Sequence, residues 1–484
     1  MDAKHDISFR QQAYIDGAWV GADTGATFAI RNPATGDTLG HAPDMGVAET
    51  RRAIDAASRA LPGWRGKTAK ERAQIMRRWF ELVIADQERL ARIITAEMGK
   101  PLVESRGEIA YGASFIDWFA EEGRRVYGDV VPASAPDRRI LVFKQAIGVT
   151  AAITPWNFPS AMFARKVGAA LGAGCTMVVK PAELAPFSAL ALVELAERAG
   201  APAGVINVVT TSDPAPVGLE LTHNPLVRKL TFTGSTEVGK ILLRQAADNV
   251  QKCSMELGGN APLIVFEDAD LDLAVKGAVA TKYRNCGQTC VSANRFLVHA
   301  SVADAFAQKL ADAAAKLTVG DGAQAGVTVG PLIEEAAVEK VERHIADALA
   351  LGARLLTGGA RHPLGGTFFQ PTVLANVRED ALIFREETFG PVAPVISFAS
   401  ETDALRLANG TPYGLAAYFY SRDVARIFRV AERLEFGMVG VNETLISTEV
   451  APFGGVKQSG LGREGSRYGV DDYLEIKYVC VGAM

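Results

Sequence analysis

Residues 148–179 read GVTAAITPWNFPSAMFARKVGAALGAGCTMVV, and the short apolar runs at the two ends of this stretch predict β-strands over 148–153 and 177–179. Helical patterns and further strand-like runs follow in alternation. They comprise predicted helices at 187–199 and 238–247 and predicted strands at 205–209 and 229–232. Strands that alternate with helices form a parallel sheet with helices on its faces. The chain is therefore predicted to have an α/β fold.

A second α/β stretch begins near Gly258. Its predicted strands span 263–266 and 295–299, and its predicted helices span 271–284, 302–317 and 336–351. A chain of 484 residues exceeds what one hydrophobic core usually supports. We therefore expect this second stretch to form a domain of its own.

A single long amphipathic helix is predicted over 69–98, near the start of the chain. Met76, Trp79 and Val83 recur there at helical spacing, and Gly99 supplies a stop signal.

Two β-rich pieces, 139–145 and 473–481, stand apart from both α/β stretches. An exposed strand edge invites pairing with another chain. We expect these pieces to contact a second subunit.

The composition excludes several classes of protein. A formal net charge of −4 gives no overall positive field to attract nucleic acid. The apolar segment 167–179 is interrupted by glycines and too short to span a bilayer, and residues 1–10 hold no apolar stretch that would serve as a secretory signal. Five cysteines are too few for a disulfide framework, so we expect a cytoplasmic protein in a reducing compartment.

Cys290 closes the segment NCGQTC, where small polar neighbours follow a helical run. Thiol nucleophiles favour such accessible places, which makes Cys290 the candidate nucleophile. No second cysteine pair exists to complete a metal site with Cys286 and Cys290, so no metal is expected. None of the six histidines lies in a motif-like context, which weakens the alternative of a Cys-His hydrolase. The remaining cysteines are expected in the core: Cys175, Cys253 and Cys480.

Two polar residues stand out as possible partners of this thiol. Glu256 lies in MELGGN, between apolar residues and a Gly pair, where an unpaired charge is costly. Asn157 lies in PWNFP, whose prolines fix the loop, and its amide is able to donate to an oxyanion. Each also has an ordinary explanation, as a solvated or capping glutamate and as a turn asparagine.

Two segments at strand ends suit a dinucleotide. FTGSTEVG places Gly234 and Ser235 between a strand and a helix, where backbone N–H groups and the helix dipole favour a phosphate. In KPAE, Lys180 and Glu183 are able to hold ribose hydroxyls, with a solvated ion pair as the alternative. Neither segment is a GxGxxG fingerprint, so each is weak evidence on its own.

The order and spacing of these segments resemble the aldehyde dehydrogenase superfamily over nearly the whole chain. The matching motifs are PWNFP, KPAE, FTGSTEVG, MELGGN, GQTC, EETFGP (386–391) and PFGGVKQSG (452–460). The resemblance implies that Cys290 is the nucleophile, that Glu256 activates the hydrolytic water, and that Asn157 forms the oxyanion hole with the Cys290 backbone N–H. It also implies cofactor contacts from Trp156, Lys180, Glu183, Gly234, Ser235, Gly239, Glu387 and Phe389.

The resemblance further implies a three-domain aldehyde dehydrogenase fold. A Rossmann-like NAD(P)-binding domain is expected over 1–126 and 147–257, and an α/β catalytic domain over 258–460. A small β bridging arm, 127–146 and 461–484, is expected to join the subunits of a homodimer or homotetramer.

Within the superfamily the chain is most similar to succinate-semialdehyde dehydrogenases. The likeness lies in FARKVGAALGAGC (163–175), KYRNCGQTCVSANR (282–295) and GREGSRYGVDDYLEIKYVC (462–480). It implies that Arg165, Arg284 and Ser447 hold the substrate carboxylate. That subfamily often has a second cysteine two residues after the nucleophile, where this chain has Ser292, so a disulfide between those positions is excluded.

The expected activity is oxidation of succinate semialdehyde to succinate, through a thioester on Cys290 that water hydrolyses. NAD is the expected cofactor because a carboxylate at Glu183 repels the 2′-phosphate of NADP, although NADP is possible because Lys180 partly offsets that repulsion. Glutarate semialdehyde or another aldehyde is an alternative substrate. A CoA-acylating aldehyde dehydrogenase or a non-catalytic relative is disfavoured by the presence of Glu256. The expected partners are the small-molecule substrate and further copies of the chain, without nucleic acid or membrane.

Overall fold

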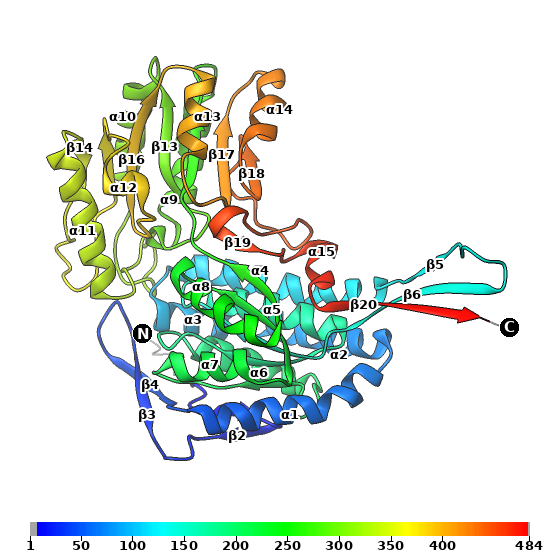
Figure 1. The fold of residues 1–484 in the computed structure, drawn as a ribbon. Helices are drawn as coiled ribbons and strands as arrows, with labels where there is room; N and C mark the ends of the chain where they lie inside the picture. The colour runs from blue at the N-terminus through cyan, green and yellow to red at the C-terminus, as the bar shows by residue number, and fades with distance from the viewer. Residues whose placement is uncertain (1–6, 483–484) are drawn as a thin grey trace.

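The computed structural model describes residues 7–482. Residues 1–6 and 483–484 lie outside the described part, and the outer limits of the predicted segments 1–126 and 461–484 fall there. Figure 1 shows two α/β bodies stacked on each other and a narrow β-arm that extends from the lower body. The predicted α/β architecture is confirmed, and the exact domain boundaries stay a prediction.

The lower body is built on an eight-stranded sheet in the order β19-β11-β10-β7-β8-β9-β1-β2. Its strands are β1 Ala13–Ile15, β2 Ala18–Val20, β7 Val149–Ile153, β8 Thr176–Lys180, β9 Ile206–Val208, β10 Val227–Thr233, β11 Lys252–Glu256 and β19 Gly460–Leu461. The strands from β7 to β11 run parallel, and the short strands at the edges are antiparallel. The central strands are almost wholly buried, which confirms the four strands predicted from apolar runs.

Helices cover this sheet on both faces. They are α1 Val47–Gly66, α2 Ala69–Ala85, α3 Gln87–Met98, α4 Leu102–Glu122, α5 Pro159–Ala173, α6 Phe187–Arg198, α7 Pro214–His223 and α8 Thr236–Ala246. Of these, α2, α3 and α4 pack mainly against one another and against α5 and α6, outside the layer that contacts the strands. The predicted single helix over 69–98 is wrong, because Asp86, with φ of −105° and ψ of 16°, separates α2 from α3. Gly99 ends α3 in the left-handed conformation, with φ of 90°, as its sequence position predicted.

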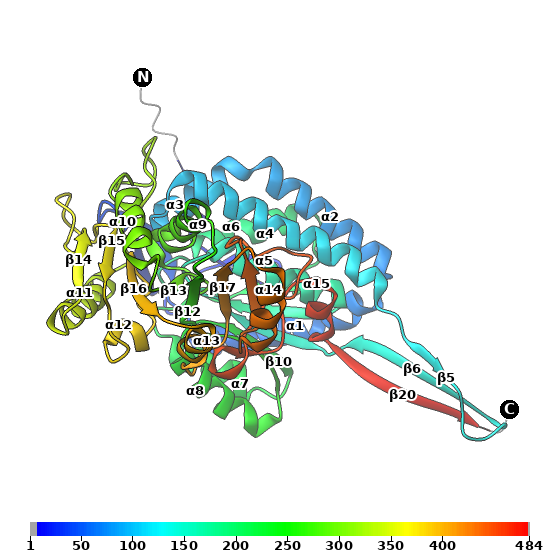
Figure 2. The same ribbon diagram turned by 90° about the horizontal axis from the view of Figure 1, so that it is seen from above.

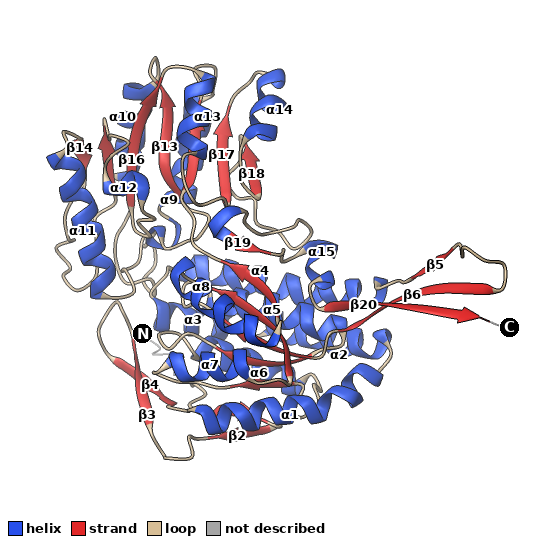
Figure 3. Cartoon of the chain, in the orientation of Figure 1, coloured by secondary structure: helices blue, strands red, loops and turns tan. Residues whose placement is uncertain are grey.

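The upper body is built on a seven-stranded sheet in the order β14-β15-β16-β13-β12-β17-β18. Its strands are β12 Ala261–Val265, β13 Ala293–His299, β14 Arg354–Thr357, β15 Thr372–Ala375, β16 Val392–Phe398, β17 Ala416–Tyr420 and β18 Met438–Val441. Its helices are α9 Leu271–Lys282, α10 Ala303–Ala314, α11 Glu335–Ala350, α12 Leu382–Arg385, α13 Glu401–Asn409 and α14 Val424–Arg433. These helices lie on both sides of the strands (Figure 3), so a second α/β body is confirmed.

The arm is a three-stranded sheet of β5 Asp129–Val131, β6 Arg138–Ala146 and β20 Leu474–Gly482. The two predicted β-rich pieces are its long strands, which pair antiparallel from Leu474 opposite Ala146 to Gly482 opposite Arg138. Figures 1 and 2 both show the arm extending away from the two bodies. The expectation that Cys480 lies in the core is therefore wrong, because it lies exposed on β20, whereas Cys175 is buried as expected.

The two bodies meet in a defined orientation. In Figure 1 the strands β13, β16 and β17 point away from the lower body, so their amino ends face it. A small hairpin of β3 Thr27–Arg31 and β4 Thr38–Pro43 and the short helix α15 Ser466–Asp471 complete the chain. Within residues 7–482, no helix has both the length and the apolar character needed to cross a membrane.

Candidate active site

A cavity of about 720 Å³ lies where the two bodies meet. Its walls come from the carboxyl ends of β7, β10 and β11 in the lower sheet and from loops that precede β12, β13 and β16 in the upper sheet. Most of the predicted site residues line it: Trp156, Asn157, Arg165, Gly234, Ser235, Glu256, Arg284, Cys290, Glu387, Phe389 and Ser447. The predicted cofactor residues Lys180, Glu183 and Gly239 lie outside this lining.

Cys290 lies just before β13, after a tight turn. In that turn Asn285 and Cys286 adopt left-handed backbone conformations, with φ of 52° and 55°. Burial raises the pKa of the Cys290 thiol to about 12, against the opposing effect of the positive charge on Arg165. The thiol is therefore protonated near neutral pH, and its use as a nucleophile requires a base.

Glu256 is the last residue of β11 and is only 3% exposed. Burial, reinforced by the nearby negative charge of Glu464, raises the pKa of Glu256 well above its usual range. Its Oε2 atom is buried and has no hydrogen-bond partner within the described part of the chain. A carboxyl group with a raised pKa and a free oxygen in a cavity has the properties of a general base.

Asn157 lies in the loop between β7 and α5. Its Nδ2 donates to the Gln288 carbonyl at 3.0 Å, which leaves its second N–H for another acceptor. Its own carbonyl accepts from Lys100 Nζ at 2.7 Å and from Asn285 Nδ2 at 3.1 Å. The amide is thus held beside the turn that carries Cys290, where an oxyanion donor is required.

The start of α8 forms one end of the cavity. Ser235 caps this helix by accepting from the Val238 N–H at 3.2 Å, and the Gly234 N–H donates to the Glu256 carbonyl at 3.1 Å. Gly239, one turn into α8, packs against Leu257, because a Cβ there would lie 2.4 Å from the Leu257 Cδ2 atom. Its small size therefore lets α8 approach the sheet.

Lys180 and Glu183 form an ion pair at the carboxyl end of β8. Lys180 Nζ lies 2.8 Å from Glu183 Oε2, with the lysine side chain buried and the glutamate side chain 41% exposed. The pair is preformed, and the exposed carboxylate is accessible to a ligand from solvent.

Glu387 and Phe389 come from the loop before β16. Burial raises the pKa of Glu387 to about 7, although a hydrogen bond from the Gly259 N–H, 2.9 Å from its Oε1 atom, opposes this effect. A Cβ on Gly258 would lie 2.9 Å from Glu387 Oε2, so a side chain at 258 would displace this carboxyl group. The Phe389 ring lies edge-on to Trp156 with 5.7 Å between centroids.

The two predicted substrate arginines differ in their surroundings. The guanidinium of Arg165 donates to Glu464 Oε2 at 3.1 Å and to the Tyr111 hydroxyl at 2.6 Å. None of the ion pairs found within residues 7–482 includes Arg284, and its buried Nε has no hydrogen-bond partner there. Both arginines line the cavity with Ser447, but Arg284 has more unused charge and hydrogen-bonding capacity.

Sequence reasoning missed several residues of this site. Tyr111, Glu108 and Glu104 come from α4 and line the cavity, and Glu464 follows β19 and pairs with Arg165. A signal was present, because positions 104, 108 and 111 lie on one face of a helix. Two glutamates on a face that is otherwise packed against the protein indicate a polar site.

Comparison with known proteins agrees with this geometry. A family model described as "Aldehyde dehydrogenase family" matches residues 19–479. A glutarate-semialdehyde dehydrogenase of Pseudomonas aeruginosa is 63% identical over 100% of both chains, and a succinate-semialdehyde dehydrogenase [NADP(+)] of Escherichia coli is 63% identical over 98% of both. The crystal structure of succinate-semialdehyde dehydrogenase from Burkholderia pseudomallei matches with a TM-score of 0.98 and 64% identity over 100% of both chains. The fold expected from the motifs is thereby confirmed, and the chain belongs to the aldehyde dehydrogenase family.

Proposed function

We propose that this protein oxidises a short aldehyde with a carboxylate at its far end, such as succinate semialdehyde, to the dicarboxylate. Cys290, Glu256 and Asn157 line one cavity with Arg284, and this single arrangement carries the proposal. The relatives named for succinate and glutarate semialdehyde both point to this substrate class.

The chemistry follows from the three polar groups. Glu256, once ionised, accepts the thiol proton, and the sulfur of Cys290 attacks the aldehyde carbon. The free N–H of Asn157 and the backbone N–H of Cys290 donate to the oxyanion that forms. Loss of hydride from that carbon leaves a thioester on Cys290. Glu256 releases the thiol proton to solvent and then takes a proton from water. The resulting hydroxide attacks the thioester carbon, which releases the acid and frees the sulfur of Cys290.

A nicotinamide dinucleotide, when bound, accepts the hydride. The residues at the α8 end of the cavity fit such a group, since Ser235 and Gly234 present a helix N-terminus for phosphate. Glu387 Oε2 is free to accept from a ribose hydroxyl, and Gly258 leaves the space beside it open. Lys180 and Glu183 would hold the other ribose. We expect NAD to be preferred to NADP, because Glu183 is a carboxylate at that position.

Arg284 is the main carboxylate-binding group in this proposal. Its guanidinium has no carboxylate partner within residues 7–482, whereas Arg165 is already paired with Glu464. Ser447 lies in the same cavity wall and is positioned to add a hydrogen bond. Arg165 lines the same cavity and contributes its positive charge there.

We also propose that the arm joins subunits of a homo-oligomer in the cytoplasm. On the three-stranded arm, Val130, Ile476 and Tyr478 are 78%, 72% and 62% exposed. Exposed apolar patches on a protein surface mark association sites. The five free cysteines agree with a reducing compartment.

The experiment is a comparison of kcat/KM for succinate semialdehyde, glutarate semialdehyde and butanal, with NAD and with NADP. We expect the acidic aldehydes to exceed butanal by about tenfold or more, since a charged hydrogen bond contributes about 1.5–3 kcal/mol. Rapid mixing of enzyme, NAD and semialdehyde should give a burst of NADH. Equal rates for butanal overturn the substrate class, and acid formation that requires CoA overturns hydrolysis by water.

A further inference from the structure

Lys100 and Glu108 form an ion pair with no solvent exposure on either side chain. Lys100 Nζ lies 2.5 Å from Glu108 Oε2, and both side chains are 0% exposed. Lys100 lies between α3 and α4, and Glu108 lies in the second turn of α4. Burying two charges costs several kcal/mol per ion before their attraction is counted, so stability alone is a weak reason for such a pair.

The pair holds the loop that carries Asn157 from two sides. Besides Glu108, Lys100 Nζ donates to the Asn157 carbonyl at 2.7 Å and lies 3.7 Å from the centroid of the Phe158 ring. Glu108 Oε1 accepts from the backbone N–H groups of Ser160 at 2.9 Å and Ala161 at 3.2 Å, in the first turn of α5. Every residue bonded by the pair lies within 157–161.

The same carbonyl links this loop to the turn that carries the nucleophile. Asn285 Nδ2 donates to the Asn157 carbonyl at 3.1 Å and to the Gln288 carbonyl at 3.1 Å. Asn157 Nδ2 donates to that Gln288 carbonyl as well, at 3.0 Å. The backbone and the side chain of Asn157 are therefore both fixed relative to the segment that ends at Cys290.

One face of α4 supports the whole arrangement. Glu104, Glu108 and Tyr111 follow at spacings of four and three residues, which places them on one side of the helix. Glu104 Oε2 accepts from the Asn285 N–H at 2.8 Å, and the Tyr111 hydroxyl accepts from Arg165 at 2.6 Å. The helix thus contacts the turn before Cys290, the loop that carries Asn157, and Arg165 through consecutive turns.

We propose that Lys100 and Glu108 are positioning residues for the oxyanion site: the pair holds Asn157 by its backbone so that the free amide N–H points to where the oxyanion forms. This inference rests on the proposed function and adds residues to its machinery. Oxyanion donors act through preorganisation, so a small displacement of the donor lowers the rate of the chemical step while substrate binding changes little.

The test is the rate of NADH formation in the first turnover, with succinate semialdehyde and saturating NAD. We expect Lys100→Met and Glu108→Gln to lower this rate about ten- to hundredfold, with the Kd for NAD unchanged. Glu108→Gln retains an oxygen that accepts from the Ser160 and Ala161 N–H groups, so it removes the charge pair and keeps the helix cap. The control is Lys229→Met, since Lys229 is also a wholly buried lysine, donating to Ser254, but lies outside the cavity lining.

A double-mutant cycle with Asn157→Ala separates positioning from general damage. If Lys100 acts through Asn157, adding Lys100→Met to Asn157→Ala changes the rate by no more than about twofold. An equal loss in both backgrounds, or the same loss in Lys229→Met, overturns the inference. Where Lys100→Met fails to fold, Glu108→Gln carries the same cycle. If the wild type forms no NADH from succinate semialdehyde, the proposed function fails instead, so the two failures are distinguishable.

Discussion

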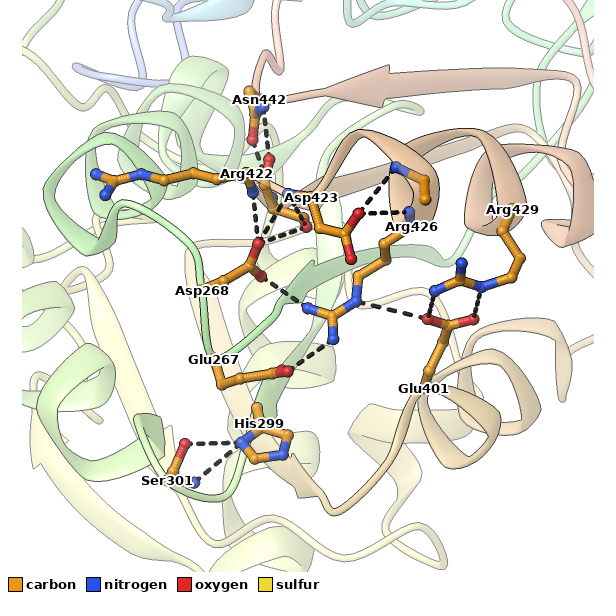
Figure 4. Close-up of polar contacts among 12 residues, drawn as sticks. Glu267, Asp268, His299, Ser301, Glu401, Arg422, Asp423, Arg426, Arg429 and Asn442 are labelled. Atoms are coloured by element: carbon orange, nitrogen blue, oxygen red, sulfur yellow. Dashed lines mark hydrogen bonds and ion pairs between the residues drawn. The ribbon is translucent and has the colours of Figure 1, made fainter.

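The carboxyl ends of the strands differ between the two parallel sheets. In the lower sheet, β7, β10 and β11 end at the cavity, next to Asn157, Gly234 and Glu256. In the upper sheet, the corresponding ends of β12, β16 and β17 are filled by an ion-pair network around Arg426 of α14 (Figure 4). Arg426 lies 2.7 Å from both Asp268 and Glu267 and 3.5 Å from Glu401.

The upper sheet instead contributes to the cavity from its amino ends. Cys290 precedes β13 and Glu387 precedes β16. At the opposite edge, Asp268 accepts from the Ser421 hydroxyl at 2.9 Å and the Arg422 N–H at 2.7 Å, and the Arg426 guanidinium lies over the Phe266 ring. The rule that ligands bind at carboxyl ends of parallel strands therefore holds only for the lower sheet. In this protein the carboxyl ends of the lower strands leave a cavity open, whereas side chains of the upper body fill the space at the carboxyl ends of its own strands. The side chains at the strand ends, and not the parallel topology alone, therefore decide where the cavity lies.

The largest expected effect comes from removing the nucleophile proposed on the upper-sheet side of the cavity, Cys290. Cys290→Ala should lower turnover by about a thousandfold or more, in line with losses of nucleophiles in other enzymes. NAD binding should persist, because the residues proposed to hold the cofactor are unchanged. The measurements are steady-state NADH formation and NAD titration by fluorescence. Turnover above about a thousandth of wild type would contradict the assignment.

The next largest effect is expected on thioester hydrolysis when Glu256, at the carboxyl end of β11, is replaced. This step should depend on pH. Because its pKa is raised, Glu256 is protonated below that pKa and unable to take a proton from water. The wild-type rate of thioester hydrolysis should therefore rise with pH and be lost as pH falls. Glu256→Gln should hydrolyse about 10²–10⁴-fold more slowly, with no dependence on pH in this range. Pre-steady-state acid release from pH 5 to 9 measures both, and a residual pH profile in the variant would argue for another base.

The sequence predicted β7 to β10 of the lower body and β12 and β13 of the upper body, because strands buried on both faces form short continuous apolar runs, as in β7 and β8. The other parallel strands, β11 and β15 to β18, were not predicted. It failed at Asp86, where apolar residues on both sides kept a helical spacing across the break. The prediction that Cys480 lies in the core was wrong for a related reason. Its apolar neighbours lie on β20, which belongs to the protruding arm and not to the core.

Most predicted site residues meet in one cavity, and several of them lie directly after a strand, as Gly234 does, or in the loop before one, as Cys290 and Glu387 do. The sequence did not reveal Glu464 as the partner of Arg165, or Lys100 as the partner of the Asn157 carbonyl. These contacts join residues 299 and 57 positions apart, and no local periodicity records such pairings. The distinction between a free and a paired arginine therefore needed the structure.

The difference between Arg284, which has no ion pair within residues 7–482, and the paired Arg165 predicts an effect of intermediate size on kcat/KM. Arg284→Leu should lower kcat/KM for succinate semialdehyde about 10- to 150-fold and spare butanal, since only the acid presents a carboxylate. Arg165→Leu removes one of the two cations paired with buried Glu464, the other being Lys166, so it should impair both aldehydes and lower the melting temperature. The measurement is kcat/KM for both substrates in each variant. Equal losses for both aldehydes in Arg284→Leu would make that arginine structural.

A smaller effect, on the preference between NAD and NADP, is expected at Glu183, which lies exposed to solvent after β8. Glu183→Ser should shift the ratio of kcat/KM values toward NADP by about tenfold, equivalent to about 1.4 kcal/mol. The shift is modest because the Glu183 side chain is 41% exposed, so solvent screens its repulsion of a phosphate, and Lys180 beside it remains. Parallel kinetics with the two cofactors measure the ratio. A wild type that already prefers NADP would contradict the role given to this carboxylate.

The smallest effect on activity is expected at the filled edge of the upper sheet, and it tests the comparison most directly. Arg426→Met should leave kcat/KM within about twofold of wild type, since Arg426 lies at the carboxyl ends, away from the cavity lining. The free energy of unfolding, measured by urea denaturation, should fall by about 1–2 kcal/mol, because Asp268, Glu267 and Glu401 lose a shared cation. The loss stays moderate because these carboxylates are 29%, 41% and 20% exposed, and water replaces part of the interaction.

The matched control for this edge is Arg429→Met, one turn further along α14. Arg429 is 47% exposed, and among residues 7–482 its one ion pair is with Glu401. Its removal should therefore lower the free energy of unfolding by less than about 1 kcal/mol and leave activity unchanged. Comparison of the two variants shows whether an effect comes from the ion-pair network around Arg426 or from the loss of any arginine on α14. If Arg426→Met lowered kcat/KM tenfold while Arg429→Met did not, the two edges of the upper sheet would be coupled. The ion-pair network at the carboxyl ends of the upper strands would then contribute to activity, although it lies away from the cavity.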